Sequence, residues 1–290
     1  MQHKTALIVD SAGSIPRDLL TKYNISEVAF HITFGIEEYR ENRTITSQEF
    51  YERMLKNPNQ VPKTSVPGAL EWIKAFAHRY NEGYKDLIVT TIAKPLSASI
   101  QSATMAADEF TGKHPDINIH IIDSNTCAGG QAALEIKIAK LINQGELSAV
   151  EIVQRIKDFL PQVISLFSVN ELTYMHAGGR IGGATAFLGK LIKIKPVCEF
   201  IDGVVHTIKP VRCRNKALQL LIDESVRRFD HAKDAVICVQ HAFCQEDADF
   251  LISELKKKLN YHDHIYQGQV GAVVGAHSGP GAIGIGIAQG

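Results

Sequence analysis

Five hydroxyl side chains stand where the sequence predicts the end of a strand or the start of a helix: Ser11, Thr64, Ser65, Ser97 and Ser124. In open α/β sheets, ligands bind at the carboxyl ends of the strands. Hydroxyl groups and the unpaired N–H groups of helix N-termini can together hold a carboxylate or a phosphate without a buried cation. The same residue types also cap helices in proteins of every function. The sequence therefore leaves two interpretations open, an uncharged oxyanion receptor or a set of ordinary helix caps.

Two further residues stand in glycine-rich segments, where small residues allow close approach of the backbone. His277 lies in the segment GAHSGPG, and a histidine there can donate a hydrogen bond to an anionic group while its charge depends on pH. Arg180 lies in the segment GGRIGG and can meet a phosphate or the carboxylate of a partner. A histidine on a surface turn and a solvated loop charge are the alternative interpretations.

Four other motifs lack what their chemistry requires. Residues 279–284 match G-x-G-x-x-G, but the helix and the acidic residue of a dinucleotide site do not follow before Gly290. Residues 183–191 resemble a phosphate-binding loop that is one residue too long and has leucine in place of the magnesium-binding hydroxyl residue. Alanine two residues before Ser278 excludes a nucleophile elbow, and the pair at residues 262 and 264 has no third metal ligand nearby in the sequence.

Composition excludes several classes of partner. The 290 residues include 31 Lys and Arg against 31 Asp and Glu, so the net charge is zero, and a broad electrostatic attraction to nucleic acid is not expected. The length and the 45% hydrophobic content predict two domains with cores of their own. We find no apolar run of about 18 residues and no signal peptide at the start. With five cysteines and no C-x-x-C pair, these features predict a cytoplasmic protein with reduced thiols.

Apolar runs alternate with helical stretches through the first half of the chain. Capping boxes begin helices at Thr46 and Ser148, Ser14 is expected to cap a helix, and Thr64 or Ser65 is expected to cap another that ends at Gly83. A Gly-Gly turn is expected at residues 129–130. Continuous apolar strands between helices predict a parallel sheet with helices on both faces. The predicted strands are residues 6–10, 27–33, 86–92 and 117–123.

The second half has a different pattern. Two strand-like runs flank Asp202-Gly203, which is a strong signal for a two-residue hairpin. A glycine-rich loop at 178–183 is followed by a predicted helix to residue 192, and a second glycine-rich loop occupies 275–282. Hairpin and helices together predict a mixed sheet, so the fold class is α/β with a parallel-sheet domain at 1–160 and a mixed-sheet domain at 161–290. Further predicted elements are strands at 164–169, 196–201, 204–211, 235–240 and 264–267, an apolar segment at 283–288, and helices at 215–228 and 246–259.

Seven short motifs occur in an order that resembles the DegV family. The resemblance runs from about residue 6 to the C-terminus and therefore covers essentially the whole chain. The motifs are V-D-S (9–11), T-S-x-P (64–67), L-S-x-x-x-Q-S-A (96–103), D-S (123–124), G-G-R-I (178–181), D-G (202–203) and G-x-H-x-G-P-G-A (275–282).

The resemblance implies a three-layer α/β/α domain followed by a mixed-sheet domain, with a fatty acid buried in a pocket between them. It also implies a bacterial, cytoplasmic protein of phospholipid synthesis that presents the carboxylate of a long-chain fatty acid to a separate fatty acid kinase. The kinase would form acyl-phosphate from ATP, so this chain would need no catalytic residue, metal or cofactor. By the same resemblance, the carboxylate ligands are Thr64, Ser65, Ser97 and His277, the kinase contact is Arg180, and the pocket vicinity includes Ser11, Ser124, Gly279 and Gly281.

Other interpretations remain open. A lipid carrier or sensor without a kinase would use the same pocket, and transient contact with a membrane is compatible with either function. An autonomous hydrolase or phosphotransferase would need Asp10, Asp123 and His277 as acid–base groups. Residues 68 and 98–100 depart from the family pattern, so no preference for chain length or unsaturation is predicted.

Overall fold

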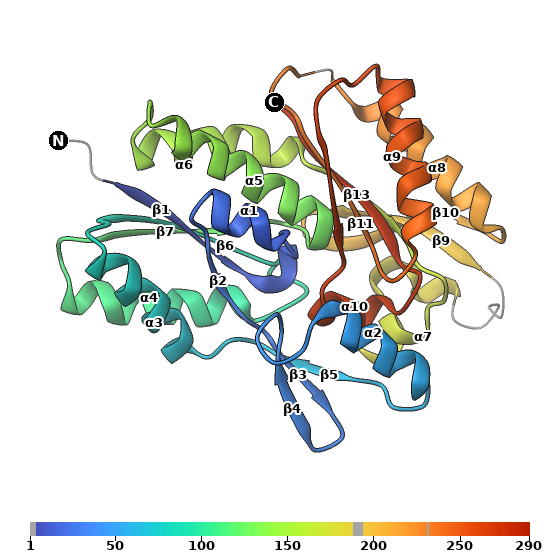
Figure 1. Cartoon of the computed structure of the whole chain (residues 1–290), viewed down its shortest axis with the longest axis horizontal. Helices are drawn as coiled ribbons and strands as arrows, with labels where there is room; N and C mark the ends of the chain where they lie inside the picture. Colours follow the sequence, from blue (N-terminus) through green and yellow to red (C-terminus); the bar gives the residue numbers. More distant parts are fainter. Residues whose placement is uncertain (1–3, 188–193, 231) are drawn as a thin grey trace.

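Four parallel strands from the first half of the chain form one sheet, in the order β2-β1-β6-β7 (Figure 1). The computed structural model describes residues 4–187, 194–230 and 232–290. Within these residues, no helix is both long and apolar enough to cross a membrane. The strands of this sheet are β1 (Thr5–Asp10), β2 (Ser26–Val28), β6 (Asp86–Thr91) and β7 (Asn118–Asp123).

Helices cover both faces of the parallel sheet, which confirms the predicted layers. Because side chains alternate along a strand, Leu7 and Val9 of β1 point to one face, and Ala6 and Ile8 point to the other. Leu7 and Val9 pack against the layer of α1 (Arg17–Lys22), α5 (Ala128–Gln144) and α6 (Ala149–Phe159). Ala6 and Ile8 pack against the layer of α3 (Ala69–Asn81) and α4 (Ser99–Lys113).

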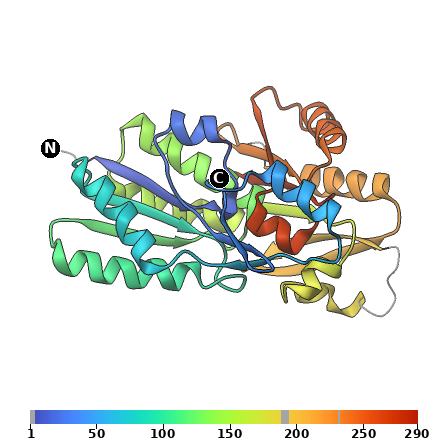
Figure 2. The same cartoon turned by 60° about the horizontal axis from the view of Figure 1, so that its bottom comes forward.

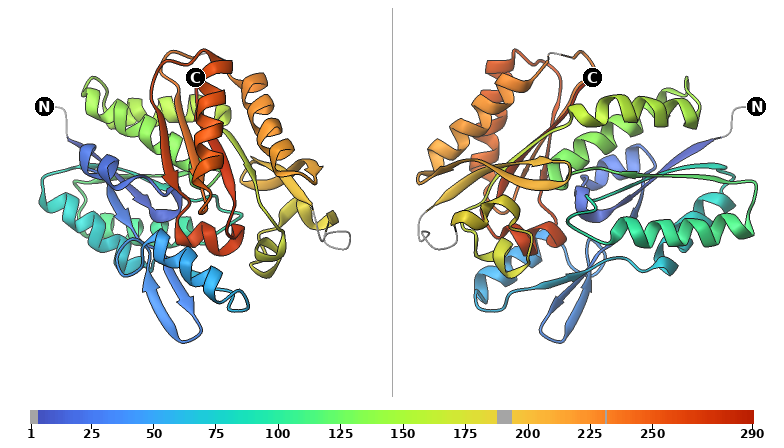
Figure 3. Two further views of the ribbon diagram at one scale, coloured as in Figure 1. Left: turned by 45° about the vertical axis from the view of Figure 1, so that its right-hand side comes forward. Right: turned by 180° about the vertical axis from the view of Figure 1, so that it is seen from behind.

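Six strands form a second, mixed sheet in the order β10-β9-β8-β13-β11-β12. Only β11 and β12 are parallel neighbours, so the predicted fold class is confirmed. Asp202 and Gly203 form the predicted hairpin, with φ angles of 49° and 77°. Helices α8 (Arg214–Arg228) and α9 (Gln245–Leu259) cover one face (Figure 3). The strands are β8 (Ile164–Ser168), β9 (Lys195–Ile201), β10 (Val204–Val211), β11 (Val236–His241), β12 (Ile265–Gln269) and β13 (Ile283–Ala288).

A third sheet was not predicted. The expected strand at residues 27–33 is divided between β2 and a three-stranded antiparallel sheet in the order β4-β3-β5. The chain leaves the parallel sheet at Phe30, because its N–H donates to the Ser11 hydroxyl and its carbonyl accepts from Glu41. The prediction that Thr64 or Ser65 caps a helix is wrong, since both lie in β5, and Gly68 precedes α3. The strands are β3 (His31–Phe34), β4 (Glu37–Arg40) and β5 (Lys63–Ser65).

Several helix starts also differ from the prediction. Ser14 has a left-handed φ of 52° and ends the short helix η1 (Ser11–Gly13), so it does not cap α1, which follows Pro16. The expected turn at residues 129–130 is the first turn of α5. The first half of the second glycine-rich loop, residues 275–278, is instead the end of a helix, α10 (Ala272–Ser278), whose residues Ala272, Val273 and Ala276 are buried. The capping boxes at Thr46 and Ser148 are confirmed; they begin α2 (Ser47–Lys56) and α6.

Two short elements follow β8. They are α7 (Thr173–Ala177) and the 3-10 helix η3 (Gly182–Phe187), and another, η2 (Leu160–Gln162), precedes β8. The end of the helix predicted to reach residue 192 lies outside the described residues.

Helix α5 joins the two halves of the molecule. It contacts β1 of the parallel sheet together with β11 and β13 of the mixed sheet. One buried cluster therefore combines Val9 of the first sheet with Val236, Cys238 and Ala288 of the second. The boundary predicted near residues 160–164 falls just before β8, and the division into two domains stays a prediction.

Gly286→Ala is expected to lower the free energy of unfolding by about 1–3 kcal/mol, measured by urea denaturation. An added Cβ at Gly286 would overlap the carbonyl oxygen of Gly129 and the nitrogen of Gly130 on α5. Gly112→Ala in α4 is the matched control, since an added Cβ there has no described neighbour within 4 Å apart from the adjacent residues and the backbone of its own helix. Equal stability of the two variants would contradict the close packing of α5 on β13.

Candidate functional site

A largely apolar cavity of about 220 Å³ lies where the parallel sheet, the mixed sheet and α10 meet. Figure 2 shows α10 at the centre of the molecule, beside α2. The walls come from the end of β6, the first turn of α5, strands β8 to β10, and α10. Buried apolar side chains of these segments form one cluster around the cavity. An apolar space of this kind is suited to a hydrocarbon group.

Thr64 and His277 meet at this cavity although 213 residues separate them. Strand β5 pairs with β3 so that Thr64 stands opposite Ile32, and α10 brings His277 to it. The Thr64 Oγ1 and His277 Nε2 atoms are 2.9 Å apart. The imidazole also packs on Gly178, where an added Cβ would overlap Nδ1. The glycine in the G-G-R-I motif therefore makes room for the ring.

His277 is held in its neutral form. Burial lowers its pKa to about 4, and the positive charge of Arg180 acts in the same direction. At pH 7 the ring is therefore uncharged. The Nε2 atom can therefore bind another group by a hydrogen bond rather than by charge. The Nδ1 atom has no hydrogen-bond partner among the described residues.

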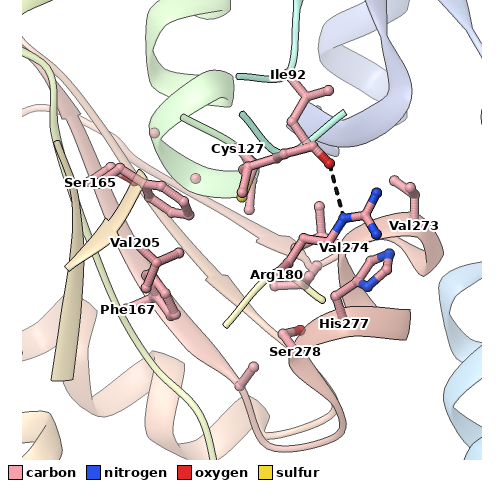
Figure 4. A pocket seen from close by; sticks show the side chains of 18 of the residues that line it. Ile92, Cys127, Ser165, Phe167, Arg180, Val205, Val273, Val274, His277 and Ser278 are labelled. Atoms are coloured by element: carbon pink, nitrogen blue, oxygen red, sulfur yellow. Dashed lines mark hydrogen bonds between the residues drawn. The ribbon is translucent and has the colours of Figure 1, made fainter. Parts of the chain in front are cut away.

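Arg180 lies at the solvent side of the same cavity (Figure 4). Its Nε donates to the Leu96 carbonyl at 3.1 Å, and Nη1 donates to the Gly178 carbonyl at 2.6 Å. These bonds join the glycine-rich loop after α7 to the segment that carries Ser97. The remaining guanidinium surface is exposed, which allows it to meet an anion from outside.

Ser97 and Ser65 also line the cavity. The Ser97 Oγ atom accepts a hydrogen bond from the Ser99 backbone N–H at 3.2 Å, so this serine takes part in the start of α4. Its hydroxyl proton is still free to be donated to a ligand. The N-cap of α4 is Ala98, so Ser97 is not the helix cap, and its role as a carboxylate ligand stays a prediction.

The other predicted residues lie outside the cavity lining. Ser11 is fully buried and donates to Glu41, and Ser124 bonds within its own turn to Thr126. Gly279 and Gly281 form the left-handed turn between α10 and β13, where an added Cβ would overlap Tyr174 or Asn170. None of these four residues is part of the cavity wall.

Ser278 was missed as a site residue. Its Oγ atom is buried in the cavity wall and has no hydrogen-bond partner within the part of the chain that the structure describes. The sequence places Ser278 next to His277. A loop was expected there, however, and a loop does not determine which way the side chain points. The helical backbone of α10 places both residues at the cavity.

Three carboxyl groups, those of Asp10, Glu41 and Glu135, are buried near the segments that line the cavity. Burial raises the pKa of Asp10, although hydrogen bonds from Gln131, Ile92 N–H and Ser99 oppose that effect. Burial likewise raises the pKa of Glu135 well above its usual range and that of Glu41 to about 8. These groups bond to backbone and side-chain donors and thereby hold η1, α4, α5 and α10 together.

The arrangement does not form the acid–base set of a hydrolase. Asp10 has its oxygens occupied by four donors, and Asp123 accepts from the N–H groups of Lys94 and Asn125. Neither carboxyl group is bonded to His277. In the described part of the chain we also find no group of three or more side chains that could hold a metal ion.

Comparison with known proteins agrees with the motif order. Residues 4–290 match the family model described as "Uncharacterised protein, DegV family". The chain belongs to the DegV family. Protein DegV of Bacillus subtilis is 31% identical over 283 residues, which are 97% of each chain.

Solved structures of the DegV family have the same fold. A fat acid (stearic acid)-binding protein from Eubacterium ventriosum is 27% identical and superposes with a TM-score of 0.91, covering 99% of this chain and 98% of that one. DegV of Bacillus subtilis, described as a fatty acid binding protein, is 29% identical with a TM-score of 0.86, covering 99% and 100%.

Proposed function

We propose that this protein binds a long-chain fatty acid, with the acyl chain in the apolar cavity and the carboxylate at Thr64, Ser65, Ser97 and His277. The observation that carries the proposal is the Thr64–His277 pair at the wall of an otherwise apolar cavity. The description of Bacillus subtilis DegV as a fatty acid binding protein, and of the Eubacterium ventriosum protein as binding stearic acid, support it.

The physical chemistry of the cavity fits this ligand. Each buried CH₂ group contributes about 0.8 kcal/mol, so contact with a long chain supplies most of the affinity. The carboxylate then needs hydrogen-bond donors that fix its orientation, and hydroxyl groups and a neutral histidine can provide them. The exposed Arg180 adds a positive charge beside this group without being buried with it.

We further propose that the bound acid is a substrate presented to a separate kinase. A carboxylate oxygen would attack the γ-phosphorus of ATP held by the kinase, forming acyl-phosphate and releasing ADP. Arg180 supports this step because it is exposed and lies beside His277, where the kinase would reach the carboxylate.

Native mass spectrometry of the purified full chain tests the binding proposal. We expect a mass increase equal to a long-chain fatty acid, which denaturation and extraction release. A protein that carries no acid and does not take up added palmitate would overturn the proposal.

Arg180→Ala is expected to reduce acyl-phosphate formation with a fatty acid kinase at least tenfold, while palmitate affinity changes less than threefold. The physical reason is that the guanidinium can contact the partner at the solvent side, whereas the acyl chain lies in the apolar cavity. The measurement is ADP release by the reconstituted pair. Arg155→Ala, an exposed arginine on α6, is the matched control. Unchanged turnover for Arg180→Ala would favour a lipid carrier or sensor over a kinase partner.

Ser97→Ala is expected to reduce the same turnover by weakening the hold on the carboxylate, with the melting temperature retained. Unchanged turnover in this variant would contradict the assignment of Ser97.

A further inference from the structure

Gln240 is a buried polar side chain in the wall of the apolar cavity. It lies on β11 and is 1% exposed. Because side chains alternate along the strand, Ile237 and Val239 point toward α8 and α9, whereas Cys238 and Gln240 point to the opposite face. That face carries α5 and the cavity, and Gln240 is one of the lining residues.

The hydrogen bonds of Gln240 determine which way its amide points. The Nε2 atom donates to the Gly13 carbonyl at 2.9 Å and to the Ser14 carbonyl at 3.1 Å. Two carbonyl groups can only accept, so the amide nitrogen must occupy that side and the oxygen must occupy the other. The Oε1 atom has no hydrogen-bond partner among the described residues. A buried acceptor without a donor is unfavourable, and one beside a ligand cavity can be satisfied by the ligand.

The strand next to Gln240 has a glycine beside its side chain. Strand β13 lies between β11 and β8, and it alternates isoleucine with glycine. Ile283 and Ile285 belong to the cluster under α8 and α9, and all three residues from 283 to 285 line the cavity. Gly284 stands directly opposite Gln240 and places no side chain beside its amide; an added Cβ there would lie 3.1 Å from the Leu166 carbonyl oxygen.

The cavity wall contains a second polar side chain. Ser165 on β8 is 7% exposed and lines the cavity. Its Oγ atom accepts a hydrogen bond from the Thr126 hydroxyl at 2.8 Å, so its own proton can be donated elsewhere. Figure 4 shows Ser165 across the cavity from His277. Gln240 bonds to Ser14, whose hydroxyl accepts from the Gly271 N–H at the start of α10, whereas His277 lies in the last turn of that helix, so Gln240 and the proposed carboxylate site lie at opposite ends of α10.

We propose that the cavity selects fatty acids that carry a hydroxyl group in the half of the chain distant from the carboxylate. The ligand hydroxyl donates to Gln240 Oε1. A plain alkyl chain leaves the Gln240 oxygen unpaired. The proposal rests on the fatty-acid-binding function proposed above and adds the chemical class of the preferred chain.

The test compares dissociation constants of the full chain for stearic acid and for its 2-, 10-, 12- and 18-hydroxy derivatives. We expect at least one of the three distal isomers to bind about three- to tenfold more tightly than stearic acid, which is the range of one net hydrogen bond. The 2-hydroxy acid should gain nothing from Gln240, because its hydroxyl lies beside the carboxylate.

Gln240→Met keeps the length of the side chain and removes the acceptor. We expect it to abolish the preference for the distal isomers and to leave the ratio for the 2-hydroxy acid unchanged. Ser97→Ala is the matched comparison, because it should weaken all of the acids by the same factor. Thermal melting shows whether Gln240→Met is folded, and the series on the unaltered protein tests the proposal without any variant.

The outcomes separate this inference from the proposed function. If no acid binds, the fatty-acid-binding function itself fails. If stearic acid binds as tightly as every distal isomer, or if Gln240→Met retains the preference, the inference is overturned, since an ordered water then satisfies Gln240 Oε1.

Discussion

Glu41→Gln is expected to raise the free energy of unfolding by on the order of 3–4 kcal/mol at pH 8 and by only about 1 kcal/mol at pH 5. Burial raises the pKa of Glu41 to about 8, and the nearby Glu27 and Asp10 carboxyl groups add to that effect. In the unfolded chain the group ionises near its ordinary value of 4.5. Its contribution to stability is therefore complete below pH 4.5 and is lost as the pH rises toward 8.

The contacts of Glu41 allow glutamine to replace it. One carboxyl oxygen bonds with the Ser11 hydroxyl, and the other accepts from the Val273 N–H at 2.8 Å. A glutamine amide can donate to the first and accept from the second. The variant thus reproduces the neutral form of the side chain at every pH.

Urea denaturation at pH 5 and pH 8 measures the effect. Glu38→Gln, an exposed position on β4, is the matched control and should change stability by less than about 0.5 kcal/mol at both values. If Glu41→Gln proves no more stable than the unaltered protein at pH 8, Glu41 is ionised in the fold and its two donors stabilise the charge.

His277→Ala is expected to weaken palmitate binding about 10- to 100-fold at pH 7. A hydrogen bond to a charged group contributes about 1.5–3 kcal/mol, and this substitution removes such a donor together with its support from Thr64. Competition against a fluorescent fatty acid measures the dissociation constant. The apolar wall is unchanged, so some affinity should remain.

His206→Ala is the matched control for this prediction. His206 is exposed on β10, and its removal should leave palmitate affinity within twofold. Melting curves of both variants identify any loss of folded protein. An unaltered dissociation constant for His277→Ala would show that the carboxylate lies elsewhere in the cavity.

Strong periodic patterns were enough to predict both large sheets. Strand β6 is buried along its whole length, and its sequence contains the apolar run at residues 87–89. Asp202-Gly203 predicted its hairpin because few residue pairs accept two left-handed φ angles in succession. Apolar runs and turn residues determine local structure with little influence from the remainder of the chain.

The site was harder to predict because long-range contacts determine it. Strand β5 is three residues long, too short for any period, and only its pairing with β3 makes Thr64 part of a strand. The glycines around His277 suggested a loop, whereas packing of Val273 and Ala276 makes that segment a helix. Nothing in the sequence marked Gln240 as a site residue. The orientation of its amide is determined by carbonyl groups more than 220 residues away in the chain.

The position of α5 restricts how the molecule can move. Its residues belong to one buried cluster with both sheets, and Gly286 lies directly beneath its first turn. A hinge motion that separated the two sheets would expose Val236 and Cys238 to water, at a free-energy cost that grows with the apolar area uncovered. The apolar contact through α5 therefore opposes any separation of the two sheets.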